Sequence, residues 1–189
     1  QTLERNPREN HRHYLNHFSM RPPQDTMNKM AEHGIHITQQ PNFTYTLEGR
    51  YADNLDGWRL AHNNPLRGPM DAGIKVALSS DILPIGPMVG LYAATTRKGM
   101  SGEVYGPDEA ITLQEALRGY TLTSAFINFD ENIKGSLEAG KYADMIVLPG
   151  NLLATPAEEL MAVEVQQTYL QGELVYQRTA KGAQTQQEP

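Results

Sequence analysis

The first half of the chain alternates between segments of strand character and segments of helix character. Residues 24–33 place Met27 and Met30 at the spacing of one helix face, and Gly34 follows where a helix would end. Residues 35–38 then alternate in the manner of a strand. Strands that alternate with helices form a parallel sheet with crossover connections. The pattern therefore predicts an α/β fold.

The same succession recurs in the next segment of the chain. Residues 58–72 have helical character interrupted by prolines, residues 74–78 form a short apolar run typical of a strand, and residues 88–97 are apolar like a buried helix. We expect a long polar loop at residues 42–57. A strand at residues 11–18 would begin the series.

The character of the sequence changes near residue 112. Thr112 and Glu115 have the spacing of a capping box, which predicts a helix start. Residues 135–148 and 163–178 have strand character, and Gln171-Gly172 in the second segment predicts a hairpin turn. We expect two parts and a disordered tail, at residues 1–130, 131–178 and 179–189.

The composition excludes several classes of protein. The chain has 16 basic and 22 acidic residues, a net charge of −6, and no cysteine. The acidic balance argues against nucleic-acid binding, which needs a basic face. No apolar run approaches the ~20 residues of a membrane-spanning helix. Without cysteine, any metal must be held by histidine and carboxylate.

Asp81 stands three residues after the apolar run at 74–78. In parallel α/β folds, ligands and catalytic groups gather at the carboxyl ends of the strands. An aspartate there can bind a metal and take a proton from metal-bound water. The competing interpretation is that Asp81 caps the next helix.

Two other strand ends carry candidate residues. His17 ends the first expected strand and is a candidate metal ligand, and His11 and His13 would share its strand face. Gln39 and Gln40 end the next strand, and an amide there can contact a polar substrate. For each of these residues a purely structural role is the alternative.

Several motifs in the right order resemble one family. The run GSLEAGKYADMIVL at residues 135–148 resembles the C-terminal signature of the amidohydrolase superfamily. Residues 115–125 resemble the helix before that signature, and residues 168–176 resemble the hairpin of the small β-sandwich that follows the barrel. With Asp71-Ala72-Gly73-Ile74 and the strand end at Asp81, the chain resembles amidohydrolase family 3. That branch contains YtcJ-like hydrolases, proteins like the exoenzyme regulatory protein AepA, and N-substituted formamide deformylases.

The resemblance implies a fold and a set of site residues. The fold would be the C-terminal part of a (β/α)8 TIM barrel, about three βα units, with C-terminal strands of the β-sandwich. His17 would be the metal-ligand histidine of the sixth strand, and Asp81 the eighth-strand aspartate that binds metal and acts as general base. Gln39 and Gln40 would end the seventh strand and face the substrate. Asn16 stands where the family often has Glu.

The resemblance also implies a function. It is the metal-dependent hydrolysis of carbon–nitrogen bonds other than peptide bonds, in a small amide-like substrate, with zinc as the expected divalent metal. The family's first-strand His-x-His, its middle-strand carboxylate or carboxylated lysine, and its fifth-strand histidine have no counterpart here. A catalytic zinc needs three protein ligands. We therefore expect a C-terminal fragment that is inactive in isolation and binds metal weakly or not at all.

Other expectations concern partners and alternatives. Open strand edges favour a homo-oligomer. We expect no nucleic-acid or membrane partner, and a cytoplasmic location. Two other functions stay open: a non-catalytic regulatory or binding module that keeps the half-barrel, and a fragment with no independent role. The substrate and the identity of the metal are not specified by the sequence.

Overall fold

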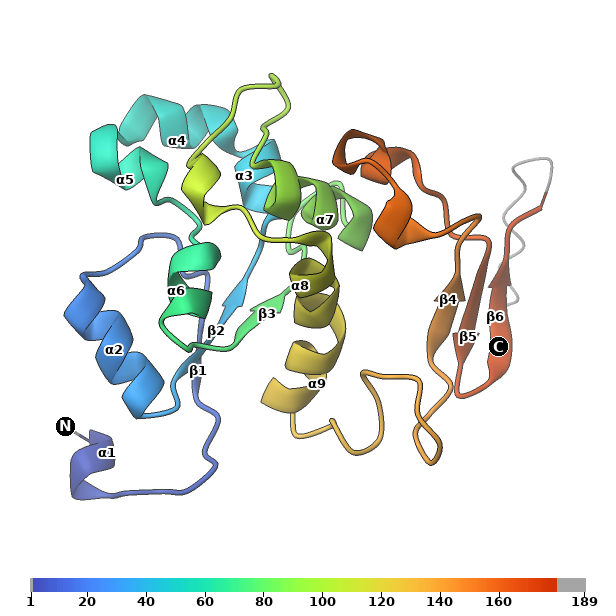
Figure 1. Ribbon diagram of the computed structural model, residues 1–189, viewed down its shortest axis with the longest axis horizontal. Helices are drawn as coiled ribbons and strands as arrows, with labels where there is room; N and C mark the ends of the chain where they lie inside the picture. Colours follow the sequence, from blue (N-terminus) through green and yellow to red (C-terminus); the bar gives the residue numbers. More distant parts are fainter. Residues whose placement is uncertain (1, 180–189) are drawn as a thin grey trace.

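The computed structural model describes residues 2–179 and contains two small β-sheets (Figure 1). The first is parallel, has the order β1-β2-β3, and consists of β1 (Tyr14–Asn16), β2 (His36–Gln39) and β3 (Val76–Leu78). The second is antiparallel, has the order β4-β5-β6, and consists of β4 (Met145–Val147), β5 (Gln167–Leu170) and β6 (Glu173–Gln177). The predicted α/β class is confirmed.

Helices connect the strands of the parallel sheet. Helix α1 (Thr2–Arg5) precedes β1, and α2 (Gln24–Glu32) lies between β1 and β2. Between β2 and β3 lie α3 (Asn42–Thr46), α4 (Glu48–Asn54), α5 (Gly57–Ala61) and α6 (Arg67–Asp71). After β3 follow α7 (Pro87–Thr96), the 3-10 turn η1 (Pro107–Glu109), α8 (Leu113–Arg118), the π-helical turn η2 (Gly119–Thr123) and α9 (Ser124–Ile127). The 3-10 helices η3 (Leu152–Ala154) and η4 (Ala157–Ala162) separate β4 from β5.

The hydrophobic core lies around the parallel sheet. Met27 and Met30 of α2 are both buried, as their helix-face spacing predicts, and Ile37 of β2 is fully buried. Leu160 of η4 is also fully buried and belongs to the same cluster. The second sheet is therefore joined to the first part of the chain through η4, which packs on α7 (Figure 1).

Three local predictions are confirmed. Gly34 follows the end of α2 with a φ of 61°, the left-handed conformation that glycine favours. The Thr112 hydroxyl accepts from the Glu115 N–H at 3.2 Å, and the Glu115 carboxylate accepts from the Thr112 N–H at 2.8 Å. Gln171-Gly172 turns β5 into β6 with φ of 53° and 86°.

Three boundaries were predicted wrongly. The expected strand at 11–18 spans only Tyr14–Asn16, because Arg12 has a φ of 48° that breaks the extended backbone. The expected strand at 135–148 begins only at Met145, since Gly135 and Gly140 turn the chain with φ of 96° and 92°.

The expected loop at 42–57 instead contains α3 and α4. Tertiary contacts order this polar segment: Asn42 is fully buried, and the Glu48 carboxylate accepts from the N–H and the hydroxyl of Ser101. Of the expected disordered tail, residues 180–189 lie outside the described residues. Across residues 2–179 the structure contains no helix with the length and apolar character needed to cross a bilayer.

Arg97 is a buried charge that the sequence did not reveal. A cation at the end of a helix interacts favourably with the helix dipole and needs no other role. Arg97 is 1% exposed, and its guanidinium donates to the carbonyls of Asn63, Asn64 and Tyr105 at 2.8–3.0 Å. Burial lowers the pKa of Arg97 to about 10, which keeps it charged at neutral pH. Arg97 thereby holds the loop before α6.

Candidate metal centre

The carboxyl ends of the three parallel strands bring the predicted site residues together. We call this place the carboxyl edge and define it by His17 after β1, Gln40 after β2, and residues 79–81 after β3. In register, Asn16 of β1 lies beside Thr38 of β2. Because all three strands run in the same direction, residues distant in sequence meet at one edge of the sheet.

His17 and Asp81 face each other at the carboxyl edge. His17 Nε2 and Asp81 Oδ2 are 3.5 Å apart, and their side chains are 43% and 53% exposed. Two ligand atoms of a tetrahedral zinc with bond lengths of about 2.0–2.2 Å are separated by roughly 3.4 Å. The pair therefore has the donor chemistry and the spacing of two ligands to one metal ion.

Both residues also have unusual backbone conformations. His17 has a φ of 53° and Asp81 a φ of 57°, in the left-handed region. That region costs a residue other than glycine about 1–2 kcal/mol. Such outliers concentrate at functional sites, although buried Asn64 and Arg97 share the conformation here. The strain supports a functional role for the pair only together with their proximity.

The alternative role of Asp81 as a helix cap is excluded. Helix α7 begins at Pro87, its N-cap residue is Gly86, and no side chain accepts a hydrogen bond from its first turn. The segment between Asp81 and α7 is held instead by Asn42, whose amide donates to the carbonyls of Pro84 and Gly86 at 3.1 and 3.4 Å.

The His17 ring is held from two sides. Its Nδ1 lies 2.9 Å from Oε1 of Gln40, and its ring stacks on Phe43 with 5.5 Å between the ring centroids. Asn16 Nδ2 lies 3.3 Å from His17 Nε2. The Tyr120 phenol donates to the Ser79 carbonyl at 3.4 Å, and burial raises the pKa of the phenol, which therefore stays a neutral donor.

The two candidate glutamines are engaged within the protein. Gln39 is fully buried, and its amide donates to the carbonyls of Phe18 and Pro65 at 2.7 and 3.2 Å. These bonds fix the segment that follows His17. Gln40 is 1% exposed and bonds to the His17 ring. A substrate contact by either amide stays a prediction.

The other histidines do not join this centre. His11 and His13 stack on each other at 4.5 Å, and His11 Nε2 lies 2.7 Å from the carbonyl of His33. His36 is buried, and desolvation is the main cause of its lowered pKa. Among residues 2–179, no three His, Asp or Glu side chains are grouped closely enough to hold a metal ion. The described chain supplies two donors, one fewer than a catalytic zinc requires.

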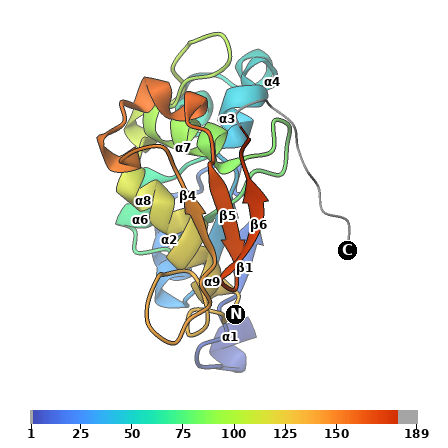
Figure 2. The same cartoon turned by 90° about the vertical axis from the view of Figure 1, so that its right-hand side faces the viewer.

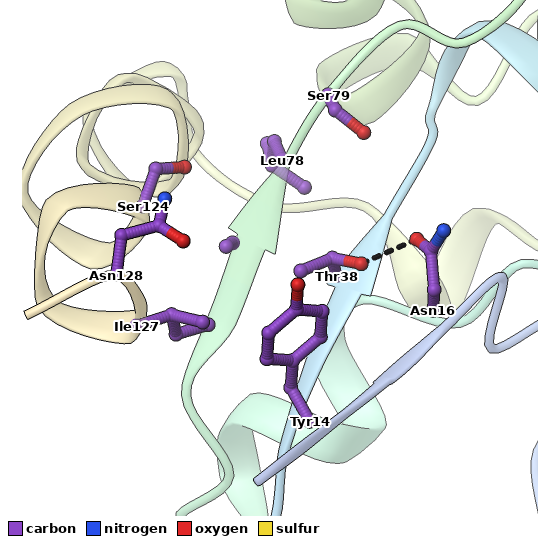
Figure 3. Close-up of a pocket in the computed structure, with 9 residues that line it drawn as sticks. Tyr14, Asn16, Thr38, Leu78, Ser79, Ser124, Ile127 and Asn128 are labelled. Carbon is purple, nitrogen blue, oxygen red and sulfur yellow. Dashed lines mark hydrogen bonds between the residues drawn. The ribbon is translucent and has the colours of Figure 1, made fainter. Parts of the chain in front are cut away.

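A pocket of about 200 Å³ opens between the parallel sheet and α9 (Figure 3). Polar side chains from all three strands or their ends line it, including Asn16, Thr38 and Ser79. The sequence did not predict that these three residues would meet. The signal was available, since each is a polar residue within or directly after a short strand, but only the strand register shows that they meet.

Comparisons with known proteins agree with the fold and the motifs. A model of the amidohydrolase family matches residues 1–176. The N-substituted formamide deformylase of Arthrobacter pascens is 34% identical over 159 residues, which cover 80% of this chain and 28% of that protein.

Two solved structures share the fold. A metal-dependent hydrolase from Pyrococcus horikoshii OT3 has a TM-score of 0.65 at 22% identity, covering 77% of this chain and 30% of its own. A variant of atrazine chlorohydrolase TrzN from Arthrobacter aurescens TC1, complexed with zinc and atraton, has a TM-score of 0.58 at 20% identity. The match covers 90% of this chain and 38% of the TrzN chain. This chain thus spans about a third of the proteins it resembles. It belongs to the amidohydrolase family.

Proposed function

We propose that this chain is the C-terminal part of a metal-dependent amidohydrolase that hydrolyses carbon–nitrogen bonds other than peptide bonds. The observation that carries the proposal is the His17–Asp81 pair, 3.5 Å apart at the carboxyl ends of parallel strands. Residues 1–130 would form about three βα units of a (β/α)8 barrel, and residues 131–178 would form strands of a β-sandwich. The remaining barrel strands would come from the rest of a longer protein.

In this proposal His17 Nε2 and Asp81 Oδ2 hold one divalent metal. Zinc is the expected ion because histidine and carboxylate suit it and because the related TrzN structure contains it. A bound metal would supply Lewis acidity and a water activated near neutral pH. The Asp81 carboxylate, half exposed, is open to that water and would accept its proton. The substrate would be a small amide-like molecule, of which the formamides of the deformylase are one example.

The chain alone is expected to be inactive. Two donors do not complete a catalytic zinc site. Calorimetric titration of the full chain with zinc chloride should show no tight stoichiometric site, and N-substituted formamides should not be hydrolysed. A tight site in this chain would contradict the proposal that the metal centre is incomplete without further residues.

The metal-binding roles can be tested in the longer protein. His17→Ala and Asp81→Asn should each reduce bound zinc and abolish hydrolysis. Asp53→Asn changes an exposed aspartate of α4 in the same way and should leave both unchanged. Full zinc content and activity in the His17 and Asp81 variants would refute the assignment.

Because residues 2–179 offer no group of three donors, a second candidate function is a regulatory or binding module that keeps the half-barrel without a full metal site. The coding sequence upstream of Gln1 separates the two functions. A His-x-His motif on a strand there supports the hydrolase, and its absence supports the module.

We also propose that copies of the chain associate through open strands. In β1, Tyr14 and Leu15 are about half exposed, and all five residues of β6 are exposed. Unpaired edges with exposed apolar side chains favour association. Multi-angle light scattering should give a mass above that of one chain, and a stable monomer would contradict this proposal.

A further inference from the structure

We propose that Gln40 and Asn16 are positioning residues that keep the proton of the neutral His17 ring on Nδ1 and leave the Nε2 lone pair free for a metal. A neutral imidazole carries its proton on one nitrogen, and the hydrogen bonds of the ring select which. The inference rests on the proposed metal-binding role of His17, and it assigns Gln40 a task other than substrate contact.

Gln40 lies beside Nδ1 of the His17 ring. Its amide nitrogen donates to Ser79 Oγ at 2.8 Å and to Asn16 Oδ1 at 3.0 Å. These two acceptors orient the amide, so that Oε1 faces His17 Nδ1 at 2.9 Å. A carbonyl oxygen only accepts, so Nδ1 must carry the proton. Gln40 is almost fully buried, so water does not compete for the bond.

Asn16 lies beside Nε2 of the same ring. Its Oδ1 accepts from Thr38 Oγ1 at 2.5 Å and from Gln40 Nε2 at 3.0 Å. The amide nitrogen of Asn16 therefore turns toward His17 and lies 3.3 Å from Nε2. An NH2 group only donates, so Nε2 must be unprotonated. The two neighbours thus specify the same tautomer from opposite sides of the ring.

The position of Asp81 gives this tautomer its consequence. With the proton on Nδ1, the Nε2 lone pair and an Asp81 carboxylate oxygen face each other at 3.5 Å. Two electron-rich atoms at that distance are stabilised by a cation between them. The Asn16 contact, at 3.3 Å, is the longest in the network and is the one that a cation would replace. The network therefore prepares the ring for a metal before a metal arrives.

The tautomer can be read directly by NMR. The experiment uses the full chain, labelled with nitrogen-15 and freed of metal, at alkaline pH where imidazole is neutral. Long-range proton–nitrogen correlations distinguish the protonated ring nitrogen from the bare one, and a His17→Asn variant assigns the signals. The wild-type ring should show a single species protonated on Nδ1. A ring protonated on Nε2, or an even mixture, would overturn the inference.

Paired variants test the two neighbours separately. Gln40→Leu removes the acceptor and should give a mixture of tautomers. Gln40→Glu keeps an acceptor oxygen and should preserve the Nδ1 proton. Asn16→Asp sets a carboxylate beside Nε2 and should draw the proton there. Gln24→Leu makes the same change as Gln40→Leu on the exposed face of α2 and should leave the tautomer unchanged.

Folding is checked in the same spectra. If Gln40→Leu loses the dispersed amide signals of a folded chain, the near-isosteric Gln40→Glu and Asn16→Asp variants carry the test, because they are expected to act in opposite directions. An unchanged tautomer in Asn16→Asp, or its loss in Gln40→Glu, would refute the positioning role.

Zinc content in the longer protein separates this inference from the proposed function. The expected tautomer in this chain, together with unchanged zinc content in the His17→Ala variant of the longer protein, leaves the positioning role intact and counts against the metal-binding role. Reduced zinc content in that variant, together with a ring in this chain that lacks the expected tautomer, supports the metal-binding role and counts against the positioning role.

Discussion

The two sheets of this chain differ in how completely the chain covers them. In the parallel sheet, all three residues of β3 are buried, and Ile37 in β2 has no exposed surface. In the antiparallel sheet, β4 is only partly covered and all of β6 is exposed (Figure 2). Apolar side chains are present in both, including Ile146, Leu174 and Val175 in the second. The described chain thus covers β2 and β3 of the first sheet, whereas β1 is exposed like much of the second sheet.

The difference shows where the stability of this chain resides. Helices pack against the apolar side chains of β2 and β3, while the second sheet contacts the core chiefly through η4. Buried apolar area stabilises a fold and exposed area does not. The carboxyl edge, which carries the proposed site, therefore rests on the better-packed region. Four predictions test this comparison.

Loss of the buried guanidinium should have the largest effect. Arg97→Met leaves two buried carbonyls and one partly buried carbonyl without this donor and should lower the free energy of unfolding by about 4–5 kcal/mol. Arg59→Met makes the same change on an exposed face of α5 and should stay within about 0.5 kcal/mol. Urea unfolding followed by circular dichroism measures both. Equal losses of unfolding free energy in the two variants would mean that the buried Arg97 guanidinium stabilises the fold no more than an exposed one.

Matched truncations compare the sheets directly. Ile37→Ala opens a cavity in the covered sheet and should lower the free energy of unfolding by about 4 kcal/mol. Val175→Ala, in a strand that is exposed throughout, should change it by less than about 0.5 kcal/mol. The same denaturant titration applies, at a chain concentration too low for copies to associate. A large loss in Val175→Ala under that condition would contradict the difference between the sheets, whereas a loss that appears only at higher chain concentration is what the proposed homo-oligomer predicts.

Leu160 tests the connection between the two regions. It is fully buried in η4, so Leu160→Ala should lower the free energy of unfolding by about 3 kcal/mol. If η4 is the main link, the variant should also unfold in two separate steps, whereas the wild type should unfold in one. Calorimetry resolves the steps. Met161→Ala, at the partly exposed neighbouring position, is the control. One step in the Leu160 variant would show that other contacts join the regions.

The smallest effect is expected at the Glu115 capping box. The bond from Arg67 is the main reason that the pKa of Glu115 falls to about 2 from its ordinary value of 4.5. A carboxylate with a depressed pKa stabilises the fold above its unfolded pKa and loses that contribution as the pH falls through the folded value. Glu115→Gln should therefore cost about 1 kcal/mol at pH 7. The difference from wild type should shrink between pH 4.5 and about 2.

Thermal unfolding across that pH range measures the Glu115 effect. Glu173→Gln, in exposed β6, makes the same change in the second region and should give a curve parallel to that of the wild type. If the stability difference between Glu115→Gln and the wild type stays constant down to about pH 2, the Arg67 bond is excluded as the source of that difference.

Local patterns predicted those elements whose causes lie close together in sequence. The helix stop at Gly34, the Thr112 capping box and the Gln171-Gly172 turn each depend on a few neighbouring residues, so the sequence was sufficient. Prediction failed where distant contacts order the chain. The helices of the 42–57 segment depend on contacts such as that of Glu48 with Ser101.

The candidate site divides in the same way. His17 and Asp81 could be proposed because each follows or ends an expected strand, and parallel strands share a carboxyl edge. Their strained backbones and the hydrogen bonds that orient the His17 ring could not be read from the sequence. Apart from the contact between the neighbours Asn16 and His17, these bonds join residues more than 20 positions apart, such as Asn16, Gln40 and Ser79. Only the strand register brings those residues together.

By itself, the sequence determined the α/β class, the amidohydrolase family and which polar residues lie near strand ends, because periodicity and short motifs are local properties. The tertiary structure decided which of those residues meet. It paired His17 with Asp81, excluded His11 and His13, and turned Gln40 toward the ring of His17. The reason is physical: a hydrogen bond requires its two atoms within about 3 Å, a distance set by packing and strand register across the whole sheet.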